Sequence, residues 1–394
     1  MASGRFSTVA FLDAGHYSVS DTIYVPSGAR IVGEVLAAVI VGTGPKFSDI
    51  NNPHPVVMIG RPAEVGYVAM SDVIVSTKGT APGAVLIQYN LYSPATPNAT
   101  SANHPPSGLW DVHTRVGGFA GSGLQVANCP ITPFVINHVD SRCIGAHTSM
   151  HITSGAGNLY IENSWLWVAD HDIEDIKRTR ITVYAGRGLL IECSRIWLVG
   201  TAVEHHALYQ YQLVNASDIW MGQIQTETPY YQPNPPAPYP FRARSAEYWD
   251  PDFDAQCLHN PYNREYHNGT ATLDLPGSPP CAMAWGLRIL SSENVLVFGA
   301  GLYSFFANFH TTCSQAASGE NCQARIFAIG PAMGDGFPRG ALMSKDLSTV
   351  QIYNLNTVGA VSMVTQQGAD MALWRDNYAN FASTLAVFRY RRPS

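Results

Sequence analysis

Charged residues are scarce in this sequence. Asp, Glu, Lys and Arg make up 13% of the 394 residues, about half of the ~25% that is usual in soluble proteins. Helix surfaces need Glu, Lys and Arg, so this scarcity excludes a coiled coil and a mainly helical bundle. The formal net charge is −6 and no block of Lys and Arg is present, which argues against nucleic acid or an anionic membrane as a partner. No uncharged apolar run approaches the ~20 residues that a membrane span requires.

A secretory leader is also missing, because the first residues show no basic segment followed by a long apolar one. The cysteines nevertheless indicate an oxidising compartment. Seven are present without any Cys-x-x-Cys spacing, and six of them form neighbouring pairs with short loops. We therefore predict the disulfides Cys129–Cys143, Cys257–Cys281 and Cys313–Cys322, and a buried free thiol at Cys193.

These pairs predict a secreted, extracellular protein whose leader has been lost or lies on another segment. The alternative is a cytosolic protein with seven buried thiols. Three N-x-S/T sequons, at Asn98, Asn215 and Asn268, are candidate glycosylation sites.

Short runs rich in Val, Ile, Leu, Tyr or Trp recur along the chain, and each is bounded by Gly, Asn, Asp, Ser or Pro. This pattern predicts strands. The expected strands are Val56–Ile59, Tyr67–Val75, Ala84–Tyr89, Leu159–Trp167, Ile181–Tyr184, Leu189–Cys193, Ile196–Val199, Ile219–Ile224, Leu287–Leu290, Val295–Phe298 and Val350–Tyr353.

A loose repeat underlies these strands. A small or polar corner precedes an alternating strand at 153–163, 184–193, 214–222 and 291–299, and the first three lie about 30 residues apart. Strands at a fixed period without intervening helices predict an all-β parallel solenoid, in which each coil buries its inward face by stacking on its neighbours. An antiparallel sandwich is the alternative, but the two-residue turns that it favours are absent between these strands.

A segment rich in Pro, Tyr and Asn, residues 228–283, interrupts the repeat. We interpret it as a surface excursion from one coil, pinned by Cys257 and Cys281. Loops of this length tend to be functional.

Aromatic residues are concentrated in the middle coils. Alternation along a strand sends every second side chain outwards, and outward aromatic rings beside amides suit a sugar, which offers C–H faces and hydroxyls together. The alternative is that these rings fill the solenoid core or pack under the excursion. The residues are Trp110, Trp165, Trp167, Tyr209, Tyr211, Trp220, Tyr230 and Tyr231.

Two segments, 165–175 and 200–233, hold the densest chemistry of this charge-poor chain. Glu204 lies between Val203 and two histidines. A carboxylic acid walled by apolar groups stays protonated and can donate to a leaving oxygen, so Glu204 is the candidate acid; the alternative is a solvated turn carboxylate. His205 and His206 point to opposite sides of a strand, so a metal site is not predicted there.

Asp170 and Asp172 share a strand face. They are candidates for a calcium site, for a catalytic pair, or for an Asp ladder that stabilises a solenoid corner.

The sequence resembles glycoside hydrolase family 55, the fungal and bacterial β-1,3-glucanases. The resemblance covers nearly the whole chain and is carried by runs such as GHYSVSDTIYVPSGARIVGE (15–34), YIENSWLWVADHDIED (160–175), GTAVEHHALYQYQLVNASDIWMGQIQTETPYYQP (200–233) and VLVFGAGLYSFFANF (295–309). It implies a right-handed parallel β-helix and exo-acting, inverting hydrolysis of β-1,3-glucan, with no cofactor. The glutamate of the family's G-T-x-x-E-H motif is its general acid, and it falls on Glu204.

The resemblance also implies a domain organisation. Residues 1–394 correspond to the second of two β-helix domains, and the upstream β-helix, which contributes residues that position the attacking water, is absent from this sequence. Where the family usually reads GEVW or GEAW and VEWN, this chain has GEVL (33–36) and IQYN (87–90). One carboxylate and two tryptophans are thereby replaced, by Gln88, Leu36 and Tyr89.

The expected site follows from these points. Glu204 is the acid, and Asp170 and Glu192 are the candidates for water activation. The expected sugar contacts are Trp165, Trp167, His205, Tyr209, Gln225 and Tyr231. Three functions remain open: hydrolysis of β-1,3-glucan, non-catalytic glucan binding by a decayed half-enzyme, and a pectin-active lyase or hydrolase.

Overall fold

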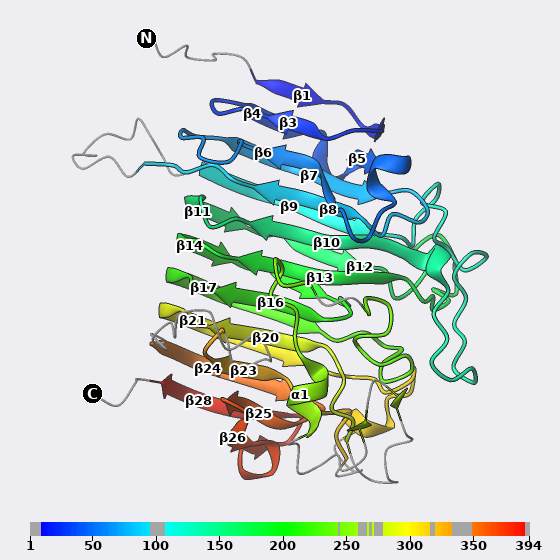
Figure 1. The fold of residues 1–394 in the computed structure, drawn as a ribbon, viewed down its shortest axis with the longest axis vertical. Helices are drawn as coiled ribbons and strands as arrows, with labels where there is room; N and C mark the ends of the chain where they lie inside the picture. Colours follow the sequence, from blue (N-terminus) through cyan, green and yellow to red (C-terminus); the bar gives the residue numbers. More distant parts are fainter. Residues whose placement is uncertain are drawn as a thin grey trace.

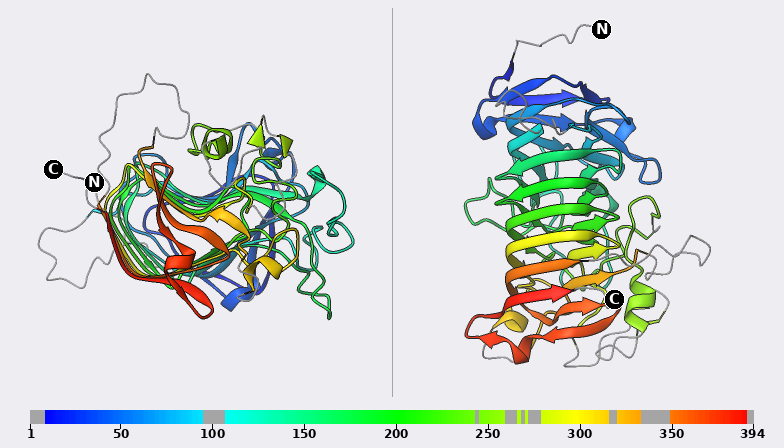
Figure 2. Two further views of the ribbon diagram at one scale, coloured as in Figure 1. Left: turned by 90° about the horizontal axis from the view of Figure 1, so that it is seen from below. Right: turned by 90° about the vertical axis from the view of Figure 1, so that its left-hand side faces the viewer.

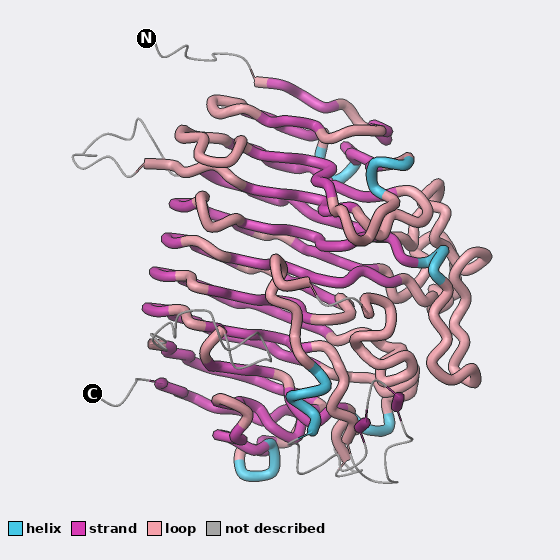
Figure 3. Tube along the Cα trace, viewed as in Figure 1, coloured by secondary structure: helices cyan, strands magenta, loops and turns pink. Residues whose placement is uncertain are grey.

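The computed structural model describes residues 9–94, 107–242, 245–258, 266–267, 270–271, 279–315, 320–332 and 349–390. The strands stack along the long axis of the molecule, with β1 at one end and β28 at the other (Figure 1). Viewed along the stack, the coils superimpose on one another (Figure 2). Long loops gather along one side of the stack (Figure 3).

Two sheets form the walls of the stack in the described residues. The larger sheet has 15 strands, and its main path runs β1-β4-β7-β9-β11-β14-β17-β21-β24-β28-β27. Its strands are β1 (Ala10–Leu12), β2 (Gly15–Val19), β4 (Arg30–Gly33), β5 (Ala38–Gly42), β7 (Ala69–Thr77), β9 (Ser107–Val116), β11 (Gly157–Glu162), β12 (Trp165–Val168), β14 (Ser194–Val199), β15 (Ala202–Glu204), β17 (Ser217–Glu227), β21 (Glu293–Tyr303), β24 (Val350–Val358), β27 (Tyr378–Ala379) and β28 (Ala382–Tyr390).

The second sheet has 11 strands in the described residues, and its main path runs β22-β25-β23-β20-β16-β13-β10-β8-β6-β3. These are β3 (Ile23–Val25), β6 (His54–Ile59), β8 (Ala84–Tyr89), β10 (Ile144–Ile152), β13 (Tyr184–Ile191), β16 (Tyr209–Val214), β20 (Trp285–Leu290), β22 (Gln323–Arg325), β23 (Phe327–Gly330), β25 (Ala360–Gln366) and β26 (Ala369–Leu373).

Helices are few in the described part of the chain. The one α-helix found there is α1 (Phe253–Leu258), and none of the helices found is long and apolar enough to cross a membrane. A small separate hairpin pairs β18 (Tyr266–His267) with β19 (Thr270–Ala271). The 3₁₀ turns are η1 (Val35–Ala37), η2 (Pro45–Phe47), η3 (Ser141–Cys143), η4 (Thr312–Ser314) and η5 (Trp374–Asp376).

Pairing within the coils is parallel, for example between β11 and β14 and between β14 and β17. Antiparallel pairs in the two large sheets come from the last strands, β26, β27 and β28. The predicted parallel β-helix is therefore confirmed and the antiparallel sandwich is wrong. Of the expected strands, Ile181–Tyr184 is misplaced, because β13 begins only at Tyr184.

A ladder of left-handed residues bends the parallel coils of the larger sheet at one level. Asp, Asn and Gly tolerate positive φ better than other residues, which accounts for all but one member of this ladder. In each coil, the residues before the bend form the first arm of the sheet, and the residues after it form the second arm. The members of the ladder, aligned by the strand register, are Asp72, Asp111, Asn163, Gly200, Gln223, Gly299 and Asn354.

Alternation on the second arm decides which side chains reach the surface. Leu166, Val203 and Thr226 pair across β12, β15 and β17, and all three are buried against the core. The residue after each one points to the opposite side of the sheet. Glu204 therefore lies on the outer face of the second arm.

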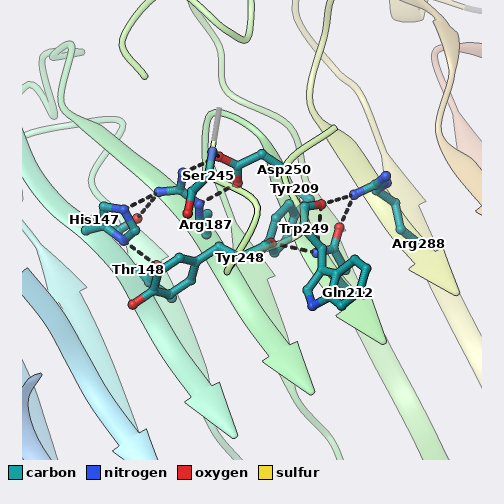
Figure 4. A network of polar contacts seen from close by, with 10 residues as sticks. All are labelled: His147, Thr148, Arg187, Tyr209, Gln212, Ser245, Tyr248, Trp249, Asp250 and Arg288. Carbon is teal, nitrogen blue, oxygen red and sulfur yellow. Dashed lines mark hydrogen bonds and ion pairs between the residues drawn. The ribbon is translucent and has the colours of Figure 1, made fainter. Parts of the chain in front are cut away.

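The excursion predicted at 228–283 leaves the coil after β17 and returns before β20, and its residues 245–250 are clamped on the outer face of the second sheet (Figure 4). Arg187 donates to both carboxylate oxygens of Asp250, at 2.6 Å for the Nε bond. Its Nη1 donates to Nε2 of His147 at 2.8 Å. Burial and the Arg187 charge hold the pKa of His147 well below its usual range, so this imidazole is neutral.

Tyr248 and Trp249, which precede Asp250 in the excursion, are held through their carbonyl groups. Tyr209 Oη donates to the Tyr248 carbonyl at 3.1 Å, and Gln212 Nε2 donates to the same oxygen at 3.0 Å. Arg288 donates to the Trp249 carbonyl at 2.9 Å. The excursion is thus a fixed part of the surface at this point.

The cysteine predictions are confirmed. Cys129–Cys143, Cys257–Cys281 and Cys313–Cys322 are disulfides, and Cys193 is buried and free.

Candidate active site

Glu204 is the last residue of β15, and its neighbours on the adjoining strands are Trp167 and Glu227. The Glu204 side chain faces outwards but is only 7% exposed. The carboxyl group therefore sits at the surface of the coil but is almost fully shielded from solvent.

Both carboxyl oxygens of Glu204 accept a hydrogen bond. Trp165 Nε1 donates to Oε2 at 2.8 Å, and Gln225 Nε2 donates to Oε1 at 2.9 Å. Trp165 and Gln225 flank Ala202 on the neighbouring strands, so the register of three strands fixes the orientation of the carboxyl group.

Burial is the largest cause that shifts the pKa of Glu204, and it raises the pKa. The negative charges of Glu227 and Asp170 raise it further, while His205 and the Trp165 hydrogen bond lower it. The net shift is upward, so Glu204 keeps its proton at a higher pH than a free glutamic acid does.

His205 connects this carboxyl group to two others. Its Nε2 lies 3.9 Å from Asp170 Oδ1 and 4.0 Å from Glu227 Oε2. Its Nδ1 is 3.3 Å from the Thr228 carbonyl oxygen, and a donor role at Nδ1 leaves Nε2 to face the carboxylates. Asp170, predicted for water activation, is thus at the site.

His206 points away from the site, as expected of the second of two adjacent residues. It bonds Ser149 Oγ at 2.7 Å and Gln210 Oε1 at 3.1 Å. Burial lowers its pKa to about 3, so the ring is neutral. No group of three or more His, Cys, Asp or Glu in the described residues could hold a metal ion.

Asp172 is buried away from Asp170. It accepts hydrogen bonds from the Val126 amide at 3.1 Å and the Glu174 amide at 3.1 Å. It holds a loop together, and it forms no catalytic pair with Asp170.

Glu192, the other candidate for water activation, is bound elsewhere. Its carboxylate bonds His151 Nε2 at 2.5 Å and Trp249 Nε1 at 2.9 Å. It therefore belongs to the attachment of the excursion on the second sheet. No local sequence pattern indicates this contact, because Trp249 comes from the excursion.

Three of the predicted sugar contacts are also corrected, because their side chains are buried. Tyr209 is fully buried beneath the excursion, and Tyr231 is 4% exposed and packs edge-on against Tyr184. Trp167 is 3% exposed, with its ring 4.9 Å from that of Trp165. It supports Trp165, which is 38% exposed.

Three residues that the site prediction omitted complete the wall. The Tyr230 ring lies 4.7 Å from His205 and 3.7 Å from Phe306, and its hydroxyl donates to Glu227 at 3.0 Å. The Arg180 guanidinium lies 4.3 Å from the Phe306 ring. Tyr230 is the neighbour of the predicted Tyr231, so the Tyr-Tyr pair was the available signal.

Comparisons with known proteins agree with this fold. Residues 5–234 match the model of the LAM55 pectate lyase-like domain, and the chain belongs to this family. This membership confirms the resemblance to family 55 glucanases.

Two curated fungal relatives are similar over nearly all of the chain. A glucan 1,3-beta-glucosidase of Cochliobolus carbonum is 42% identical over 97% of this chain and 42% of its own length. A probable glucan endo-1,3-beta-glucosidase of Arthroderma benhamiae is 38% identical over 96% of this chain and 38% of its own length. The chain thus spans about two fifths of each.

Among solved structures, sacteLam55A of Streptomyces sp. SirexAA-E, in complex with glucose, aligns with a TM-score of 0.52 at 16% identity. The alignment covers 95% of this chain and 49% of that one. At this identity the likeness shows the fold alone.

Proposed function

We propose that this chain carries the acid-bearing half of an enzyme that hydrolyses β-1,3-glucan, exo-acting and inverting, with Glu204 as general acid. The observation that supports this most is the buried, outward-facing carboxyl group whose pKa burial raises and whose two oxygens are held by Trp165 and Gln225. The names of the two fungal relatives support the substrate.

The chemical step begins at Glu204. Its proton passes to the glycosidic oxygen as the bond from that oxygen to the anomeric carbon breaks, and the leaving sugar departs as an alcohol. A water bonds to the opposite face of the anomeric carbon and gives its proton to the carboxylate that activates it. Glu204 becomes a carboxylate, and its negative charge is stabilised by the indole N–H of Trp165 and the amide N–H of Gln225.

Water activation is assigned to Asp170. An inverting enzyme needs room for a water, with the carboxyl groups roughly 6.5–9.5 Å apart. Glu227 is paired with Glu204 on the next strand, where strands lie about 4.8 Å apart, which is too close for that role. Asp170 follows β12 and is not on a strand paired with Glu204, and its Oδ1 lies 3.9 Å from His205 Nε2.

Sugar binding is assigned to Trp165 and to the wall of Tyr230 and Phe306. An exposed indole supplies a stacking face, while Gln225 and His205 supply polar groups beside the acid. The Arg180 guanidinium, stacked on Phe306, adds a donor at the edge of this wall.

We also propose that a second β-helix unit completes this face, in line with the greater length of the relatives. The support is a cavity of about 500 Å³ on the same face, lined in part by Leu36, Ile74, Arg115 and Phe119. Leu36 is 45% exposed, so apolar surface is available for such a unit. The whole chain would then be a single β-helix domain with one surface excursion at 228–283.

Secretion and glycosylation are part of the same proposal. Three disulfides suit an oxidising compartment. Of the three sequons, Asn215 is exposed in the turn between β16 and β17, while Asn98 and Asn268 lie outside the described residues.

The test is hydrolysis of laminarin by Glu204→Gln, assayed together with any second unit that activity requires. We expect a loss of about a hundred- to ten-thousand-fold in kcat, and α-configured product from the parent by NMR. Turnover equal to the parent's would remove Glu204 from the mechanism, and a parent that binds glucan without cleaving it would make the chain a binding module.

A further inference from the structure

An aromatic strip runs across the outer face of the first arm, with one ring from each of six successive strands. The strands β9, β11, β14, β17, β21 and β24 are neighbours in the larger sheet. The strip consists of Trp110, Tyr160, Trp197, Trp220, Phe298 and Tyr353.

The strand register puts these rings side by side. Tyr160, Trp197 and Trp220 occupy one row of paired positions. Phe298 and Tyr353 occupy the row two residues further on, and their rings stack at 4.8 Å. Since strands lie about 4.8 Å apart, six of them carry the strip over roughly 24 Å.

Two of the tryptophans lie down on the sheet over glycines. A Cβ at Gly108 would come within 2.0 Å of the Trp110 ring, and a Cβ at Gly222 within 2.2 Å of the Trp220 ring. Any larger residue at these glycines would lift the indole. Both tryptophans remain partly exposed, so each turns the outer face of its ring towards solvent.

The polar groups of the strip suit an uncharged ligand. The indole N–H groups of Trp110, Trp197 and Trp220 have no hydrogen-bond partner among the residues that the structure describes. Glu162 is engaged by the Tyr160 hydroxyl at 2.9 Å, and Arg389 donates to the Tyr353 hydroxyl at 3.0 Å. These two charges have opposite sign.

We propose that the aromatic strip is a second polysaccharide-binding surface, on which a neutral glucan chain lies flat. Its pyranose rings stack their C–H faces on the aromatic rings, and its hydroxyls accept from the free indole N–H groups. The choice of glucan as ligand rests on the proposed function, while the binding itself needs no catalysis.

The strip is continuous with the candidate active site. Strand β17 carries Trp220 before the bend at Gln223, and Gln225 and Glu227 after it. Glucan held on the strip is therefore kept one bend away from Glu204, which raises the local concentration of chain ends at the acid.

The experiment measures depletion of the Glu204→Gln protein from solution by insoluble β-1,3-glucan particles. Adding Trp197→Ala and Trp220→Ala together should weaken binding by at least about tenfold, because two stacking faces are lost. Gly222→Val should weaken it in the same direction, because it displaces the Trp220 ring without removing an aromatic residue. Trp374→Ala, a partly buried tryptophan on η5, is the matched control and should bind like the parent.

The same strip variants are also made in protein that keeps Glu204. They should cleave laminaritriose at the parent's rate, because a trisaccharide is too short to contact the aromatic strip and the candidate active site together. Phe298→Ala, at a side chain that is 49% exposed, provides a second variant should the tryptophan pair fail to fold. The proposal would be overturned if glucan particles depleted the strip variants from solution as well as they deplete the parent. It would also be overturned if sedimentation showed that the parent self-associates and that the strip variants do not. If Glu204→Gln turned over like the parent while the strip variants lost binding, the catalytic proposal would fall and this one would stand.

Discussion

Glu204 and Glu227 occupy paired positions on β15 and β17, and the charge of Glu227 raises the pKa of Glu204 in addition to the larger effect of burial. The Trp165 indole acts in the opposite sense, because its hydrogen bond of 2.8 Å favours the ionised form. The protonation of the candidate acid is therefore set by neighbours whose effects have opposite signs.

Glu227→Gln should move the basic limb of the kcat/KM profile to lower pH. Removing the charge lowers the pKa of Glu204, so the proton needed for catalysis is lost earlier as pH rises. Glu162→Gln is the matched control and should leave the limb in place. Glu162 also accepts a hydrogen bond from a tyrosine hydroxyl, but this tyrosine is Tyr160 of the aromatic strip. An unmoved limb in Glu227→Gln would contradict the role given to its charge.

Trp165→Phe should move the same limb to higher pH. The ring is kept but the indole donor is lost, so the ionised form of Glu204 loses a stabilising bond and its pKa rises. Trp167→Phe, whose indole makes no bond to Glu204, should leave the limb in place. The comparison is made on kcat/KM over the same pH range, and a downward shift in Trp165→Phe would disprove the assignment.

The buried clamp of the excursion should matter for stability. Arg187→Met leaves Asp250 without its charge partner in a site where both side chains are almost fully buried. We expect a loss of about 3–5 kcal/mol in the free energy of unfolding, measured by urea denaturation. Arg142→Met, at the more exposed pair with Asp140, should have a free energy of unfolding close to the parent's. An equal loss in both variants would contradict the claim that burial makes the Arg187–Asp250 pair more important for stability.

Thiol counting tests the cysteine assignment. Burial raises the pKa of the Cys193 thiol to about 12, so the native protein should react with no equivalent of a thiol reagent at neutral pH. Denaturation without reductant should expose one thiol, and reduction should expose seven. Removing Cys129–Cys143, which closes 14 residues, should cost about 3 kcal/mol, whereas Cys193→Ala should cost less.

Much of the fold could be predicted from the sequence, because each coil repeats a polar corner and a β-rich run. The corners at Asn158, Asp218 and Asn294 adopt left-handed φ values at the start of β11, β17 and β21. The first strands, β1 to β5, were not predicted. Each is only 3 to 5 residues long, which is too short for the alternation of side chains to stand out.

The site was predicted in part. Glu204, Trp165 and Gln225 lie together because strand register preserves the two-residue alternation of the sequence. The prediction failed where the alternation is broken. His205 has a φ of 67°, so the chain turns a corner there, and the direction of Tyr209 could not be inferred from Glu204.

Glu192 and Tyr231 failed for a different reason. Their surroundings are set by contacts with segments far away in the sequence. Trp249 covers Glu192, and Tyr184 covers Tyr231. Local patterning carries no information about such contacts.

The most direct test of Glu204 as the acid compares leaving groups. The dinitrophenolate leaving group of a dinitrophenyl β-glucoside departs without a proton. The glucose leaving group of laminaribiose needs one. Assayed in the same assembly as the laminarin test, Glu204→Gln should lose about a hundred- to ten-thousand-fold in kcat/KM on laminaribiose and far less on the dinitrophenyl substrate. Equal losses on both substrates, or no loss on laminaribiose, would contradict the claim that Glu204 supplies the proton.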